Sequence, residues 1–202
     1  MIEDELLRII LPIYFVIYFA ITFVLKSIIV ARKIGKSPLV LPRDDSAYGL
    51  VGFYFKLTLI AMFAYILSFA FFPNLYDCFL AINSLVRNAM KYAGLCLLVF
   101  ALAWTIIAQS HMKNFWRIGI DLDTKTELVT NGLFAFSRNP IFFGMIVSLT
   151  GLFLATPNAF TGLFLILGYM LIQIQIRLEE DFLTKEHGDH YLAYKQKVRR
   201  LI

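Results

Sequence analysis

The sequence predicts an all-α, polytopic membrane protein, a bundle of about five transmembrane helices. The chain has 202 residues, of which 59% are hydrophobic and only 16% are charged, whereas a soluble domain has about 25% charged residues. The apolar residues gather in five long runs, and the basic residues lie between these runs. No repeat, linker or low-complexity tract divides the chain, so we expect residues 1–202 to form a single membrane domain.

The five expected spans follow from the long apolar runs, of which the first contains Lys26 and the second Lys56, because a bilayer core needs roughly 20 apolar residues in a helix. They are residues 9–30, 50–72, 92–108, 140–155 and 159–176. We interpret the first as a retained anchor, since the residues before it are acidic and the run is too long for a signal peptide. Thr156, Pro157 and Asn158 join the last two spans in a tight turn, where Asn158 is suited to start a helix. These two spans should therefore form an antiparallel hairpin, although 140–155 is short for a full span.

The basic residues also predict the orientation of the chain, because loops rich in Lys and Arg stay in the cytoplasm. Fourteen Lys and Arg residues follow the first, third and fifth spans, against three on the other side. We therefore expect the N-terminus outside and the C-terminus in the cytoplasm. The net charge of +5 does not indicate nucleic-acid binding, since the basic residues flank apolar runs. Lys197, Arg199 and Arg200 are expected to contact anionic lipid headgroups.

Polar residues suggest a site on the cytoplasmic side, starting with the long loop of residues 110–139. This loop holds apolar residues such as Trp116 and Phe134, so we expect it to be ordered and packed under the bundle. It ends in Arg138-Asn139-Pro140. Proline suits the first position of a helix, and Asn139 is a natural N-cap. Arg138 beside a helix N-terminus is typical of a carboxylate or phosphate site.

Acidic residues at the end of the fifth span are expected to meet Arg138. Counting helical rise away from the turn at Asn158 places Arg138 at nearly the depth of Glu179 and Glu180. One interpretation is a salt bridge at the interface, or simply a solvated helix end. The other is a polar pocket that holds a ligand carrying both charges, since ionisable groups near membrane depth are functional hypotheses by default. The histidines do not predict a metal site, because no third ligand is spaced with them.

These motifs together resemble a known enzyme family. The segment 128–144, followed by Glu179-Glu180 and by Gly188-x-x-Tyr191-x-x-Tyr194, resembles the isoprenylcysteine carboxyl methyltransferase family, and the related phospholipid N-methyltransferases share part of the pattern. The resemblance covers residues 116–200. It implies an integral membrane, S-adenosylmethionine-dependent methyltransferase. Residues 109–202 would form its catalytic half on the cytoplasmic face, with a cytoplasmic cofactor loop, and residues 1–108 would supply three spans.

The resemblance also implies which residues form the site. The implied cofactor contacts are Glu127, Leu128, Val129, Phe134, Asn139, Pro140, Ile141, Phe142 and Glu179. Gln175 stands where the prenylcysteine enzymes have an arginine associated with the acceptor carboxylate, so we expect Gln175 and Arg177 to contact the acceptor. We expect Arg138 and Glu180 to be catalytic, with Glu180 taking the proton of an amine acceptor. The expected acceptor is a membrane lipid or a lipidated small molecule that presents a carboxylate or an amine.

Two other functions stay open on the sequence alone. Membrane sterol and enone reductases carry a similar Arg-His/Asn-Pro helix start and take a nicotinamide cofactor. A non-catalytic membrane scaffold would need the spans but not the polar cluster. The soluble methyltransferase fold is excluded, because no glycine-rich fingerprint follows a strand.

Overall fold

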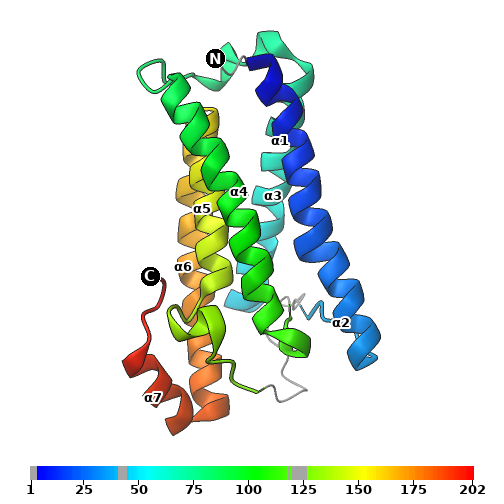
Figure 1. The fold of residues 1–202 in the computed structure, drawn as a ribbon, viewed down its shortest axis with the longest axis vertical. Coiled ribbons are helices and arrows are strands. Elements are labelled where there is room, and N and C mark those ends of the chain that lie inside the picture. Colours follow the sequence, from blue (N-terminus) through cyan, green and yellow to red (C-terminus); the bar gives the residue numbers. More distant parts are fainter. Residues whose placement is uncertain (1–3, 41–44, 118, 120–126) are drawn as a thin grey trace.

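The protein is an all-helical bundle in which the long helices run side by side (Figure 1). The computed structural model describes residues 4–40, 45–117, 119 and 127–202. Within these ranges there is no strand, only two isolated bridges. The long helices are α1 (Asp4–Phe19), continued by a π-helical turn (Ala20–Leu25) and α2 (Lys26–Ile34), then α3 (Ala47–Phe71), α4 (Asn88–His111), α5 (Pro140–Ala155) and α6 (Ala159–His187). The short α7 (Asp189–Lys197) lies at the end away from the N-terminus, called here the α7 end (Figure 1).

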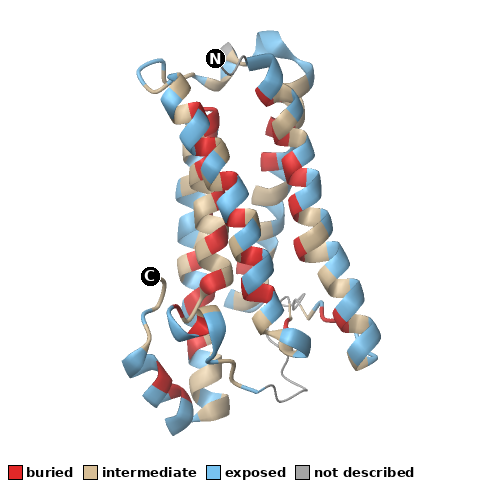
Figure 2. Cartoon of the chain, viewed as in Figure 1, coloured by how far each residue is buried: buried red, intermediate tan, exposed pale blue. Residues whose placement is uncertain are grey.

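The membrane-bundle prediction is confirmed. Within the described residues, four helices are long and apolar enough to cross a membrane: Asp4–Ile34, Ala47–Phe71, Asn88–His111 and Ala159–His187. The fifth, α5, is a shorter apolar helix, as the length of its run predicts. Buried residues lie on the facing sides of the helices, while the outward sides are exposed (Figure 2). The many exposed large hydrophobic side chains suit contact with lipid, whereas the direction of the chain across the membrane stays a prediction.

The first helix is longer than its apolar run, because an ion pair stabilises its start and a glycine ends it. At its start the carboxylate of Asp4 lies 2.5 Å from the ammonium of Lys91. At its end Gly35 takes a left-handed conformation (φ 70°), which suits glycine at a helix C-terminus. Between these ends, the π-helical turn presents the carbonyl of Thr22 to the side chain of Gln109, whose Nε2 donates to it at 2.9 Å. The first helix is thereby joined to α4.

Helices α4 and α5 pack more closely than any other helix pair in the described chain. Small residues permit this approach, since a Cβ built on Gly94 would lie 2.5 Å from the backbone nitrogen of Ala155 and 2.6 Å from the carbonyl oxygen of Gly151. Small residues at helix contacts are typical of membrane proteins, where backbones must approach for dispersion contacts to form. Trp104 fixes the start of α5 by donating from its indole to the carbonyl of Pro140 at 2.9 Å.

The tightly packed core lies toward the N-terminal end of the bundle. It includes Leu7 and Leu11 of α1, Ile66 of α3 and Leu152 of α5, each fully buried. The turn between α5 and α6 closes this end, as its sequence predicts. Asn158 accepts from the Thr161 amide in a capping box, and its Nδ2 donates to the Tyr65 hydroxyl at 2.7 Å. The packed core leaves the α7 end as the half in which a ligand cavity has room to form.

The α4–α5 contact generates a stability prediction. Gly94→Ala should lower the free energy of unfolding by about 2 kcal/mol, because the added methyl meets backbone that cannot rotate away. We expect the midpoint of thermal unfolding in detergent to fall by roughly 5 °C. Gly162→Ala in α6 is the matched control, because its Cβ would meet only the Phe153 ring at 3.4 Å and alanine favours helix. Equal midpoints for the two variants would contradict this packing.

Candidate functional site

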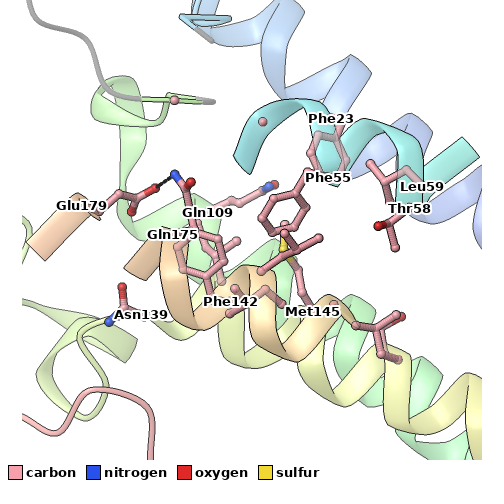
Figure 3. A pocket seen from close by; sticks show the side chains of 18 of the residues that line it. Phe23, Phe55, Thr58, Leu59, Gln109, Asn139, Phe142, Met145, Gln175 and Glu179 are labelled. Carbon is pink, nitrogen blue, oxygen red and sulfur yellow. Dashed lines mark hydrogen bonds between the residues drawn. The ribbon is translucent and has the colours of Figure 1, made fainter. Parts of the chain in front are cut away.

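A cavity of about 390 Å³ lies between the helices in the half of the bundle nearer α7. Its walls are mostly apolar and come from the long helices, including Phe19, Phe23, Phe55, Leu59, Met145 and Ile172. Along α6 its lining extends from Gly168 to Glu179, about 16 Å of helix. Figure 3 shows the aromatic side chains of Phe23, in the π-helical turn, and Phe55, in α3, on one side. The polar groups of Asn139, Gln175 and Glu179 lie on the other side. Small-molecule sites in proteins commonly have this volume and this lining.

The structure brings most of the implied site residues to this cavity. The lining includes Phe134, Asn139, Pro140, Ile141, Phe142, Glu179, Gln175 and Arg138. Glu127 is exposed, Leu128 and Val129 are half-buried, and none of the three lines the cavity. Arg177 is exposed and donates back to the carbonyl and side chain of Gln173. The cavity is therefore built by the start of α5 and the end of α6, with little from residues 127–129.

The described part of the long loop is packed against the helices, as predicted. Trp116 is almost fully buried, and the 3₁₀ turn Gly132–Ala135 contacts α4. Gly132 has a positive φ of 59°, and the imidazole of His111 lies where a Cβ would be. Glycine is therefore needed here both for backbone conformation and for space. Residues 118 and 120–126, including Lys125, lie outside the described part of the loop.

Glu180 is buried among cations from three other segments. Its carboxylate lies 3.0 Å from the guanidinium of Arg138, which agrees with the helical-rise argument. Arg200 binds both carboxylate oxygens, at 3.1 and 2.8 Å. Lys195 of α7 lies 3.8 Å away. Glu180 does not line the cavity, and both of its oxygens are already engaged, so neither is free to take a substrate proton.

Glu179 has a different environment, because adjacent helix residues point about 100° apart. It lines the cavity, and its Oε1 accepts from Nε2 of Gln175 at 2.8 Å (Figure 3). The same Nε2 donates to the Tyr48 hydroxyl at 2.8 Å. With both N–H groups of Gln175 used, its amide presents the carbonyl oxygen as the remaining polar atom.

Arg138 combines burial with an unused donor. Its side chain is only 7% exposed. Besides its contact with Glu180, it donates from Nη1 to the Lys195 carbonyl at 3.2 Å. Its Nε is buried and has no partner among the described residues. A buried donor without an acceptor is destabilising by about 1–3 kcal/mol, so the position favours a ligand that brings an acceptor atom.

The predicted N-capping role of the Asn139 side chain is wrong. Asn139 does precede α5, but its side chain makes no capping hydrogen bond. Instead its Nδ2 donates to the carbonyl of Arg200 at 2.9 Å, because residues 198–202 return beside the helix start and compete for the amide. Figure 3 shows the Asn139 oxygen turned toward the Glu179 side of the cavity and its nitrogen turned away.

Two further contacts were missed from the sequence. Arg200, expected at lipid headgroups, binds Glu180, and this hydrogen bond raises the pKa of its guanidinium above the usual range. Tyr194 of α7 donates to the Phe134 carbonyl at 2.6 Å. Beside it Tyr191 is almost fully buried, and burial, with the nearby Glu180 charge, raises its pKa to about 12. The Gly188-x-x-Tyr191-x-x-Tyr194 spacing is the sequence pattern from which the packing of α7 against the site could have been predicted.

Comparison with known proteins gives the family. A family model described as Phospholipid methyltransferase matches residues 89–190, from the first turn of α4 into α7. The chain belongs to the phospholipid methyltransferase family. The matched residues include Arg138, Asn139, Gln175 and Glu179 at the polar end of the cavity. No curated protein is similar enough to the chain to be matched. Family membership and the helical bundle together indicate a membrane methyltransferase.

The Glu180 cluster generates a second stability prediction. Glu180→Gln should destabilise the protein by about 3 kcal/mol, because it leaves the buried guanidinium of Arg138 without a counter-charge. The measurement is thermal unfolding in detergent, with Asp181→Asn, the exposed neighbouring acid, as the matched control. If the two variants unfold at the same temperature, Glu180 is not an electrostatic link between these segments.

Proposed function

We propose that the protein is an S-adenosylmethionine-dependent methyltransferase that methylates an amine on a membrane lipid or another membrane-associated acceptor. The observation that carries this proposal is the cavity of this family member, whose lining includes Arg138 and the carboxylate of Glu179. The buried Nε of Arg138 has no hydrogen-bond partner among the described residues. Family membership favours this function over the nicotinamide-dependent reductase and the non-catalytic scaffold.

The residues at the polar end suit this cofactor, which when bound supplies a methyl group on a positively charged sulfur. Its amino-acid end carries a carboxylate and an ammonium group. The buried Nε of Arg138 is a donor for the first, and the amide oxygen of Asn139 is an acceptor for the second. Glu179 can accept from hydroxyl groups of a ribose. Phe134 and Phe142 offer aromatic faces for an adenine.

The same residues favour an amine over a carboxylate as the acceptor. Gln175 presents its oxygen, and Glu179 lies one turn further along α6. Both groups are hydrogen-bond acceptors, which would bind an N–H and repel a carboxylate. Because Glu180 is enclosed by arginines, we assign the acceptance of the amine proton to Glu179 and a positioning role to Glu180. The apolar walls would exclude water and align an apolar acceptor toward the polar end.

Cofactor binding is the first test of this function. The purified protein in detergent should bind S-adenosylmethionine by calorimetry and should not bind reduced nicotinamide dinucleotides. Incubation with methyl-labelled cofactor and a total lipid extract should give a labelled product whose mass and stability to base identify an N-methyl group. A labelled methyl ester would instead mean a carboxylate acceptor, and binding of the nicotinamide cofactor alone would support a reductase.

A substitution at Glu179 tests the site itself. Glu179→Gln should weaken S-adenosylmethionine binding by about 10-fold, because it removes a charged acceptor from the cavity. Asp181→Asn is the control, since Asp181 is exposed and lies two residues further along the same helix. Both variants should unfold at similar temperatures. Unchanged cofactor affinity in Glu179→Gln would remove this residue from the cofactor site.

A further inference from the structure

Residues 198–202, called here the strap, return from α7 to the start of α5. In Figure 1 this segment rises from α7 toward the bundle. Arg199 forms a parallel bridge with Ser137, and its carbonyl accepts from the Arg138 amide at 2.9 Å. The carbonyl of Arg200 accepts from Nδ2 of Asn139 at 2.9 Å. The strap therefore binds the two residues that present polar groups to the cavity from the start of α5.

The side chain of Arg200 fastens the strap to α6. Its guanidinium holds Glu180 through two hydrogen bonds, a planar geometry that is both strong and directional. Glu180 in turn holds Nη2 of Arg138 at 3.0 Å. Because Arg200 does not line the cavity, its influence on a ligand must pass through Glu180, Arg138 and Asn139.

The strap also decides which end of the Asn139 amide faces the cavity. An amide has a donor end and an acceptor end. The strap offers a carbonyl, which can bind only the donor end, so the oxygen is left on the cavity side (Figure 3). Without the strap the Asn139 side chain would be free to turn and to cap α5, as its sequence position favours.

We propose that the strap is part of the active site and that Arg200 is a positioning residue for the ligand groups of Arg138 and Asn139. The strap lies outside the family-matched residues 89–190, so the family match does not assign it this role. The inference rests on the proposed function, since it concerns the same cofactor end of the cavity. Its immediate consequence is that Arg200 governs cofactor affinity without touching the cofactor.

The test compares Arg200→Ala and Arg200→Lys with Lys197→Ala, which removes an exposed cation from the end of α7. Arg200→Ala should raise the KM and Kd for S-adenosylmethionine by about 10-fold, with kcat at saturating cofactor changed less than about 3-fold. Arg200→Lys should restore part of the affinity, and Lys197→Ala should match the wild type. Hydrogen exchange should show faster exchange of the Arg138 amide in Arg200→Ala, because its acceptor is on the strap.

The outcomes separate this inference from the proposed function. If the wild type binds no S-adenosylmethionine, the proposed function fails, whatever the variants do. If the wild type binds and Arg200→Ala behaves like Lys197→Ala, the strap only contacts lipid headgroups and the inference is overturned. Equal loss of kcat and affinity in Arg200→Ala, with no recovery in Arg200→Lys, would also overturn it. Should Arg200→Ala fail to fold, the Arg200→Lys variant and its exchange pattern still decide.

Discussion

The carboxylate of Glu180, held between the guanidinium groups of Arg138 and Arg200, is the interaction on which the site depends. It joins the end of α6, the start of α5 and the segment after α7 at one buried point. A buried charge is tolerated only when it is paired, so each of these segments requires the other two. The direction of Glu179 into the cavity follows, because its neighbour on the helix is fixed in the cation cluster.

The two halves of the bundle are packed differently. Toward the N-terminal end, apolar side chains fill the space between the helices, and Tyr14 of α1 donates to the Leu98 carbonyl at 2.9 Å. Toward the α7 end, the same helices enclose a cavity instead. The first two long helices lie outside the family match, yet Phe19 and Phe55 form part of the cavity wall. The helices that enclose the cavity are thus packed against one another in the other half of the bundle.

Much of this arrangement could be predicted from the sequence. The apolar runs predicted the helices, the Asn158 turn predicted the α5–α6 hairpin, and helical rise placed Arg138 near Glu180. The rest depends on contacts between residues distant in the chain. The Asn139–Arg200 bond spans 61 residues and the Gln175–Tyr48 bond spans 127. No local pattern encodes such partners, so the basic residues near Arg200 suggested a lipid contact, and the different environments of Glu179 and Glu180 were not predicted.

The π-helical turn in the first helix determines the direction in which the side chains after it point around the helix axis. One extra residue in a turn rotates the following side chains by about 100° around the axis. This phase stacks Phe23 on Phe19 beside the cavity and directs the ammonium of Lys26 to the Gln109 carbonyl at the end of α4, 2.8 Å away. A single-residue deletion within Ala20–Leu25 would allow a uniform helix of nearly the same hydropathy, but it would rotate the side chains that follow the deletion by about 100°. The shape of the cavity therefore depends on the number of residues in this turn as much as on their types.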